Sequence, residues 1–433
     1  MTDLIEFLSL SDANIRYVVL GMILLGACSG IVGTFTFLRK RALIGDAIAH
    51  AVLPGVCLAF MLTGNKNPLV LLAGAVTTGW LSLVLIDWIT AKSRIKADAA
   101  IGLTLSVFFG IGILLLTLIQ KSGAASQSGL DKFLFGKAAS LVGDDLIIFG
   151  TLSIVLISVV ALFFKPFTLI SFDEAYAQSI GLPVRFIELV LASITVLAVA
   201  VGIQAVGVVL MAALLISPAA AARYWTNQLS IMVVLAAIFG AVSGIFGAYI
   251  SYTQPAMPTG PWIVVILTAI AVFSMLFAPK RGVFARYLKR RSNQMRILEE
   301  NVLKIFFQLG ELDEKAFAYR GIGQLKGRRY LKDKTIKTAL KRLMKKGYTK
   351  VKENQGVLLA KLTDKGLQTA KRQVKIHRLW EVYLTQYLKV APDHVHDDAE
   401  AIEHIITPEL EKELEHLLQN PPTDPHGTPI PYQ

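Results

Sequence analysis

The first 280 residues alternate between long apolar blocks and short polar segments. About 20 apolar residues in helical conformation cross a bilayer core of about 30 Å, so each block predicts one membrane span. The block at residues 186–222 is too long for one span and is interrupted near Gly202 and Gly207, which predicts two helices or a bent hairpin. We therefore expect an all-α polytopic membrane domain at residues 1–280, with about seven to nine spans. The remaining blocks lie at residues 17–38, 47–63, 69–90, 99–118, 146–164, 231–252 and 262–277.

A different pattern begins near residue 293, where apolar residues recur every third or fourth position, as on one buried face of a soluble helix. The elements predicted after this first helix are helices at residues 314–320 and 333–345, a β-hairpin at 347–362, and a long helix at 363–387 that Thr363 caps. This order predicts a winged helix-turn-helix at residues 293–364, followed by a helical domain at residues 365–433.

Charge follows the same division. Residues 1–280 hold 15 Lys and Arg and 12 Asp and Glu, whereas residues 281–433 hold 29 and 19. The basic second part is expected in water, where nucleic acid and anionic lipid are available as partners. Residues 281–292 form a basic junction, which predicts an anchor on anionic membrane lipid. Loops predicted on one side hold eleven Lys and Arg against five on the other, which places the C-terminal part in the cytoplasm.

Asp46 and His50 are four residues apart within one apolar block, so they share one face of a helix. Ionisable residues inside spans are costly and mark functional sites by default. A carboxylate and an imidazole together suit a divalent transition metal. The alternative is an acidic residue at a helix start beside a buried, hydrogen-bonded histidine.

A polar segment at residues 171–183 separates two apolar blocks on the predicted cytoplasmic side. It predicts a short helix that ends at Gly181, with Pro183 just beyond. Such a helix is suited to docking a soluble partner, and the alternative is an ordinary connector between spans.

Six segments of the first part resemble the ABC-type metal-ion permeases, which are the membrane subunits of manganese, zinc and iron importers. They run in order along the chain, and their combination is specific although no single one is. They are residues 41–51 (RALIGDAIAHA), 98–102 (DAAIG) with Ser106, 172–175 (FDEA) with Gly181, 204–207 (QAVG), 213–220 (ALLISPAA) and 258–261 (PTGP).

The resemblance implies that Asp46 and His50 are metal ligands in a translocation path across the bacterial cytoplasmic membrane. The chain contains no GxxxxGK[ST] sequence, so it is not expected to be an enzyme, and ATP hydrolysis is expected from a separate ATPase subunit. The other expected partners are an extracytoplasmic metal-binding protein and a second permease, either another copy of this chain or a paralogue. A coupling helix that inserts into the ATPase is implied at Glu174, Ala175, Ala177 and Gly181.

The predicted helix at residues 333–345 is apolar on one face and basic on the others. In a winged helix-turn-helix this helix enters the major groove of DNA and the hairpin touches phosphate. The alternative is a helical domain whose lysines are merely solvated, and charge and element order leave both open. The residues expected to contact duplex DNA are Lys334, Lys337, Lys341 and Arg342.

Three segments near the end resemble the DtxR-type iron- and manganese-dependent repressors. They are residues 376–381 (IHRLWE), 395–404 (VHDDAEAIEH) and 424–431 (DPHGTPIP). The resemblance covers about residues 293–431 and implies a DNA-binding domain and a metal-binding dimerisation domain, without a third, SH3-like domain. Glu400 stands where iron-selective members have cysteine, which favours manganese, the harder ion. The implied principal metal site is His377, Glu400, Glu403 and His404, and the implied accessory site is His377, Glu381 and His396.

One departure from that family concerns the first helix of the DNA-binding domain, which normally supplies a ligand that couples metal to DNA affinity. Asn301 stands at that position, and Lys304 stands where manganese-type members have an acid. A lysine ammonium is not a metal ligand at neutral pH, so a weak or absent metal response is expected. The chain as a whole is expected to be a permease fused to a repressor-like domain. The alternatives are a membrane-tethered metal-responsive transcription regulator and a permease with a degenerate regulatory tail.

Overall fold

The computed structural model divides into two compact units, Met1–Arg286 and Tyr287–Gln433, and each is described by itself. The residues that the structure describes are 6–7, 9–39, 43–64, 67–121, 136, 141, 143–254, 257–325, 332–354, 357–391, 399 and 402–432.

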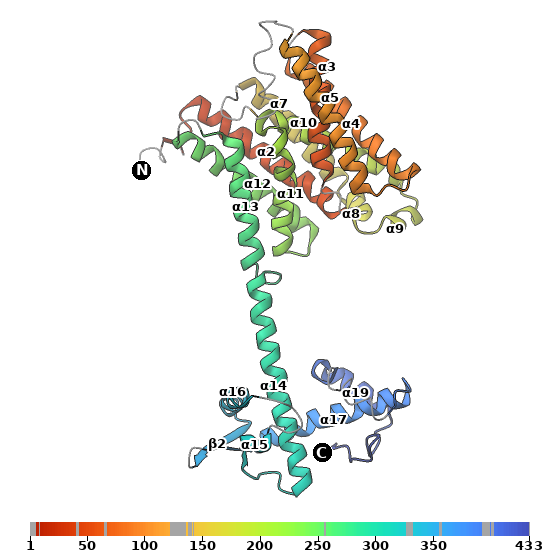
Figure 1. The fold of residues 1–433 in the computed structure, drawn as a ribbon, viewed down its shortest axis with the longest axis vertical. Helices are drawn as coiled ribbons and strands as arrows, with labels where there is room; N and C mark the ends of the chain where they lie inside the picture. The colour runs from red at the N-terminus through yellow and green to blue at the C-terminus, as the bar shows by residue number, and fades with distance from the viewer. Residues whose placement is uncertain are drawn as a thin grey trace. The chain divides into compact units, whose positions relative to one another are not determined.

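The secondary-structure elements described in the first unit are all helices (Figure 1). Helices α3, α4 and α5 contact one another, and α2 packs against α12, α11 and α7. The helices are α2 (Ala13–Leu38), α3 (Ile44–Thr63), α4 (Pro68–Lys92), α5 (Ala97–Lys121), α7 (Gly143–Leu162), α8 (Phe164–Phe172), α9 (Glu174–Ser179), α10 (Val184–Val206), α11 (Val208–Trp225), α12 (Leu229–Thr253) and α13 (Thr259–Phe277).

Eight of these helices are long and apolar enough to cross a membrane, and Leu210–Trp225 forms a shorter apolar helix. The predicted interruption of the long apolar block is confirmed, because Gly207 separates α10 from α11 with a φ of +94°. A φ in this region suits glycine and few other residues. The predicted multi-span fold is therefore confirmed. Helix α8 was missed, because its apolar residues continue directly from the block that forms α7.

Local side-chain chemistry sets several helix ends. The Asp12 carboxylate accepts a hydrogen bond from the Asn14 N–H at the start of α2. Asn67 caps α4 in the same way, with Pro68 in the first helical turn. Gly64 ends α3 in a left-handed conformation, with a φ of +63°. These are the residue types that satisfy the free N–H and C=O groups at helix ends.

Glycines bring the helix backbones close together. A Cβ added to Gly26 of α2 would lie 2.3 Å from the carbonyl oxygen of Gly240 in α12, and one added to Gly240 would lie 2.0 Å from the oxygen of Gly26. Gly55 of α3 and Gly74 of α4 approach each other in the same reciprocal way. Small residues at such contacts are expected in a membrane. Lipid does not drive apolar helices together, so close van der Waals packing has to hold them.

Burial divides the helices into inner and outer ones. In α2 and α3, 72% of the most apolar window is buried inside the unit, whereas in α13 only 22% is. Outer helices that are apolar on their exposed faces are typical of a bundle surrounded by lipid. The residue pair predicted as a metal site therefore lies on one of the inner helices.

The second unit is a winged fold followed by helices. Strands β2 and β3 form the predicted hairpin, and β3 also pairs with β1, so the sheet has the order β1-β3-β2 with antiparallel neighbours. The predicted cap at Thr363 is confirmed, because its hydroxyl accepts a hydrogen bond from the Gly366 N–H. The elements are α14 (Val283–Asp313), β1 (Arg320–Gly321), α15 (Ile322–Leu325), α16 (Asp333–Lys345), β2 (Thr349–Asn354), β3 (Val357–Leu362), α17 (Asp364–Gln386), the 3-10 helix η3 (Glu403–Ile405) and α19 (Pro408–Leu417).

The helix predicted at residues 314–320 is wrong. Glu314 has a φ of +55°, and the chain turns there before β1 begins at Arg320. The Asp313 carboxylate accepts a hydrogen bond from the Lys315 N–H and two more from the Arg320 guanidinium, at 2.8 and 2.9 Å. Side-chain bonds of this kind offer the backbone an alternative to the helix. The predicted basic junction at residues 281–292, in contrast, belongs largely to helix α14.

The contact between Gly26 and Gly240 gives a testable prediction. We expect Gly26→Ala to destabilise the membrane unit by about 1–3 kcal/mol, because the added methyl group has to push α2 and α12 apart. Thermal unfolding of the purified protein in detergent would measure the loss as a lower Tm. Gly102→Ala on α5 is the matched control, because a Cβ there meets nothing within 4 Å. Equal Tm values for the two variants would contradict the close helix contact.

Candidate functional sites

Asp46 and His50 lie together on the inner helix α3. His50 Nε2 is 3.5 Å from Asp46 Oδ1, and Asp46 is in the first turn of the helix. The His50 ring packs edge-on against Phe109 of α5, with ring centroids 4.8 Å apart. The i, i+4 spacing that predicted a shared face therefore places the two side chains in contact.

His50 Nδ1 is buried and has no hydrogen-bond partner among the described residues. One carboxylate and one imidazole are fewer protein donors than a closed tetrahedral metal site uses. No group of three or more His, Cys, Asp or Glu side chains arranged to hold a metal is found in the part of the chain that the structure describes. Within one copy, the pair therefore offers two donor groups, one carboxylate and one imidazole.

The predicted short helix at residues 171–183 is α9. Its N-terminus is capped by Asp173, whose carboxylate accepts a hydrogen bond from the Tyr176 N–H at 2.8 Å. Its C-terminus turns through Gly181, which has a φ of +83°, and the Leu182 N–H donates back to the Ala177 carbonyl. A glycine in this conformation beyond a helix is a common C-terminal cap.

Ala177 does not face outward from α9. It is fully buried and belongs to the core of its own unit, whereas Glu174 and Ala175 are exposed. Tyr176 and Ile180, four residues apart, are 55% and 52% exposed and form an outward apolar face. Sequence reasoning missed this face, although apolar residues at i and i+4 on a short polar helix were a signal that could have found it.

Arg39, at the end of α2, connects α9 with α10. Its guanidinium is paired with Glu188 of α10 and lies 3.8 Å from the Glu174 carboxylate. The side chain of Arg39 is only 11% exposed, whereas those of Glu174 and Glu188 are 49% and 31% exposed. Arg39 lies between two predicted spans, where the sequence indicates only a loop charge, because its partners Glu174 and Glu188 are 135 and 149 positions away.

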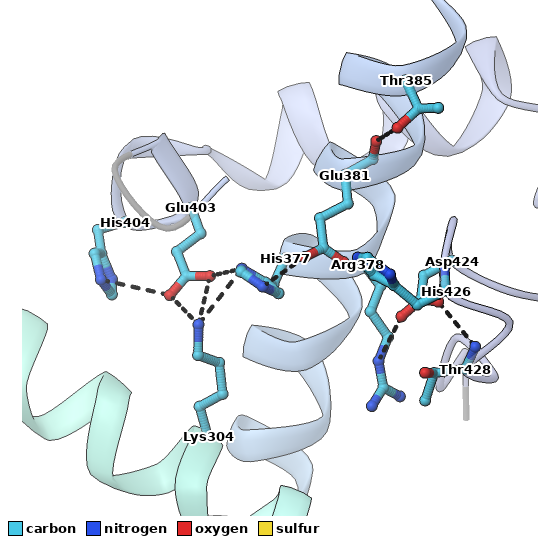
Figure 2. A network of polar contacts seen from close by, with 10 residues as sticks. All are labelled: Lys304, His377, Arg378, Glu381, Thr385, Glu403, His404, Asp424, His426 and Thr428. Atoms are coloured by element: carbon cyan, nitrogen blue, oxygen red, sulfur yellow. Dashed lines mark hydrogen bonds and ion pairs between the residues drawn. The ribbon is translucent and has the colours of Figure 1, made fainter. Parts of the chain in front are cut away.

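In the second unit, α17 and η3 bring four of the predicted metal ligands together (Figure 2). His377 Nε2 lies 3.1 Å from Glu381 Oε1, and His377 Nδ1 lies 2.5 Å from Glu403 Oε2. His404 Nε2 is 3.5 Å from Glu403 Oε1. The other two predicted ligands, His396 and Glu400, lie outside the described residues.

The ammonium group of Lys304 lies against Glu403 and His377 in this cluster (Figure 2). Its Nζ donates to both oxygens of Glu403, at 2.9 and 3.0 Å, and lies 3.4 Å from His377 Nδ1. Lys304 is 3% exposed, so its charge is held away from water. The described residues therefore do not fit a resident divalent ion at this point, because a cation already takes the carboxylate of Glu403.

The protonation of the cluster follows from its contacts. Burial alone would lower the pKa of His377, but hydrogen bonds with Glu381 and Glu403 outweigh it, and the pKa lies above its ordinary value. Burial would raise the pKa of Glu403, but His377 and Lys304 outweigh it and lower this pKa. These shifts favour a charged imidazolium and a charged carboxylate.

Helix α14 makes two more contacts with η3. The Glu300 carboxylate lies 2.7 Å from His404 Nδ1, and Arg296 donates to the His404 carbonyl at 3.1 Å. Asn301, which stands at the expected coupling position, is nearly buried, and its Oδ1 has no hydrogen-bond partner among the described residues.

Helix α16 carries a basic outer face. Its apolar residues point into the core of the unit, and Lys334, Lys337 and Lys341 are exposed. Arg342 is different, because its Nε donates to Glu299 Oε1 of α14 at 2.6 Å. All four predicted DNA-contacting residues are therefore exposed, and one of them, Arg342, also pairs with a residue of α14.

Residues 11–278 match the profile of the ABC 3 transport family, which is more than half of the chain. The chain belongs to the ABC 3 transport family. It is 43% identical over 385 residues to the manganese transport system membrane protein MntC of Bacillus subtilis (strain 168), covering 89% of this chain and 87% of that protein. It is 44% identical over 281 residues to the zinc transport system membrane protein TroC of Treponema pallidum, covering 65% of this chain and 94% of that protein.

Some relatives of this ABC 3 chain also match its second unit. A probable metal transport system membrane protein of Chlamydia trachomatis is 30% identical over 423 residues, 92% of each chain. In this chain, residues 363–432 match the profile of the iron dependent repressor, metal binding and dimerisation domain. The resemblance of the C-terminal part to the repressor family is thus confirmed.

Among solved structures, the membrane unit is similar to PsaBC from Streptococcus pneumoniae in complex with Fab. The identity is 34%, the match covers 66% of this chain and 99% of that chain, and the TM-score is 0.59. The match supports the assignment of the membrane unit to a transporter permease fold.

Proposed function

We propose that this chain is the membrane subunit of an ABC importer for a divalent transition metal, with manganese favoured over zinc or iron. The observation that carries the proposal is the Asp46–His50 contact on α3, an inner helix of a unit in the ABC 3 transport family. Manganese is favoured because the relative that covers 89% of this chain is a manganese system protein. Hard carboxylate oxygen with imidazole nitrogen is a donor set that suits this ion.

A second permease would complete the ligand set. One copy supplies the Asp46 carboxylate and the His50 imidazole, and His50 Nδ1 has no partner among the described residues. A second copy or a paralogue, facing the first across the path, would bring a second pair of donors. Four protein donors are enough to hold a transition metal ion that has lost most of its water.

The expected surroundings follow from this role. The chain spans the bacterial cytoplasmic membrane, with its C-terminal unit in the cytoplasm. An extracytoplasmic metal-binding protein delivers the ion, and a separate ATPase subunit binds at α9. Support for the docking site comes from Tyr176 and Ile180, which leave an apolar face exposed on a helix that is otherwise polar. Aromatic anchors of this kind often contribute most to a protein interface.

For the C-terminal unit we propose binding to duplex DNA through α16. Three exposed lysines on a helix whose other face is buried favour this role over a dimerisation module without DNA affinity. Arg342 is better explained as a partner of Glu299 within the same unit.

If α16 does not bind DNA, the tail is a degenerate domain. If it binds DNA and the membrane unit carries no metal, the chain is a membrane-tethered regulator.

The metal path is tested by removing its two ligands. We expect Asp46→Ala with His50→Ala to reduce manganese uptake by more than the roughly 10–100-fold that loss of an outer partner of a metal ligand costs. Uptake of radioactive manganese by vesicles containing the whole importer would measure this, with membrane insertion checked in parallel. Asp144→Ala, which removes an exposed carboxylate at the start of α7, is the control. Normal uptake by the inserted double variant would refute the proposed path.

The docking face is tested by Tyr176→Arg. We expect weaker ATPase binding, by about 2 kcal/mol or about 30-fold in Kd, because a charge replaces an aromatic anchor. Co-purification of the ATPase and manganese uptake should fall together. Gln178→Arg is the matched control on another side of the same helix.

Ala177→Arg should behave differently from both variants. Ala177 is fully buried, so the charge should lower the Tm of the membrane unit before any effect on the ATPase is measured. Unchanged ATPase binding by Tyr176→Arg would place the docking surface elsewhere.

DNA binding is tested by the salt dependence of Lys337→Ala. Each lost phosphate contact should flatten the slope of log affinity against log salt by about 0.9. The full chain in nanodiscs is titrated with duplexes enriched from a random library and with unselected duplexes, where a specific binder should discriminate by roughly a thousandfold or more. Lys412→Ala, exposed on α19, is the control. Equal slopes for both variants and no discrimination would favour the degenerate-domain alternative.

A further inference from the structure

Three side chains on one stripe of α14 contact η3. Arg296, Glu300 and Lys304 follow each other at intervals of four residues, so they lie on one face of the helix. Arg296 donates to the His404 carbonyl, and Glu300 lies 2.7 Å from the His404 ring. We call this set of contacts, together with the Lys304–Glu403 pair, the clasp.

Lys304 makes the most buried contact of the clasp. The side chains of Lys304 and Glu403 are only 4% and 1% exposed, and the ammonium donates to both carboxylate oxygens. A carboxylate that accepts two bonds from one cation and a third contact from His377 has few lone pairs left for another ion.

The Lys304 ammonium already lies where a cation would meet the Glu403 carboxylate. It contacts both oxygens of Glu403 and lies near His377 Nδ1, while His377 Nε2 faces Glu381. Both ring nitrogens of His377 face carboxylate oxygens, so neither is directed at an open coordination position. A divalent ion here would lie within a few ångströms of an ammonium, where like charges repel strongly in a buried site.

We propose that Lys304 takes the place of the divalent ion in the C-terminal unit, and that its tethered ammonium keeps α14 clasped to η3 without metal. The clasp then stays closed at every manganese concentration, so this domain does not sense the ion through the site. The proposal is independent of whether the membrane unit carries manganese and of whether α16 binds DNA.

The role proposed for Lys304 differs in one respect from that of a lysine in an ordinary buried ion pair. An ordinary pair would leave no latent metal site when its lysine is replaced by an acid. Here, Lys304→Glu would put a new carboxylate beside the Glu403 carboxylate and the Nδ1 side of the His377 imidazole, which the ammonium contacts now. Carboxylate oxygen and imidazole nitrogen suit manganese, so that variant should become metal-dependent.

The test uses the full chain in nanodiscs, with Asp46→Ala and His50→Ala in every protein so that the membrane unit does not contribute a manganese signal. Hydrogen exchange of the amides at residues 403–406 reports the clasp, measured in EDTA and in excess manganese chloride. Manganese bound per chain is measured by electron paramagnetic resonance. The proteins compared are those with Lys304, with Lys304→Met and with Lys304→Glu.

With Lys304 present, we expect the same protection in EDTA and in manganese. Lys304→Met should exchange about tenfold faster or more in both conditions, which corresponds to about 1.4 kcal/mol or more of lost local stability. Lys304→Glu should lose protection in EDTA, regain it in manganese, and bind one more manganese ion per chain than the protein with Lys304.

Two results would overturn the proposal. One is protection that rises about tenfold or more with manganese while Lys304 is present, and this measurement needs no variant at the clasp. The other is wild-type protection of the Lys304→Met protein in EDTA, because the ammonium would then not hold the clasp. Failure of manganese uptake or of DNA binding would leave both readouts unchanged, so the proposals can be judged separately.

Discussion

Hydrocarbon offers no hydrogen-bond partner to a backbone N–H or C=O, so a chain can cross it only where its own backbone satisfies these groups. The membrane unit meets this constraint with helices, and nearly all of its features follow from it. Because lipid does not press apolar helices together, the backbones must approach each other directly, and Gly26, Gly240, Gly55 and Gly74 permit the approach. Polar side chains inside such a bundle cost free energy, so they occur at few places. The Asp46–His50 pair on α3 is at one of these places.

The C-terminal unit is stabilised by different means. Its apolar core is supplemented by buried charges whose partners are distant in sequence, as in the Lys304–Glu403 pair and in Glu299, which pairs with the exposed Arg342. Breaking such a pair is costly, because one charge is then left buried alone, whereas the pair itself adds little stability over an apolar contact. Such pairs contribute to the specificity of the fold, because each buried charge is satisfied in one arrangement of the elements around it. A cluster of this kind therefore fixes the position of η3 against α14 and α17.

Features that depend on local chemistry were predictable from the sequence, and those that depend on distant partners were not. The helix break at Gly207 and the cap at Thr363 require only the residue itself and its neighbours, and both were predicted. The Asp46–His50 contact follows from helical spacing alone. The turn after Asp313 was missed, because Arg320 holds it from outside the helix. The inward direction of Ala177 was missed for a similar reason, since burial is set by the helices around α9.

The two ion pairs of Arg39 differ in distance and exposure. Its guanidinium is in close contact with Glu188 of α10, whereas Glu174 of α9 is 3.8 Å away and its side chain is half exposed. An exposed ion pair at that distance is weak, so we expect it to break before the closer, part-buried Arg39–Glu188 pair when a force acts on α9. Arg39 therefore joins the end of α2 to α10 more closely than to α9. Arg39 and Asp46 are seven positions apart in the sequence, so the end of α2 that pairs with Glu188 is close along the chain to the start of α3.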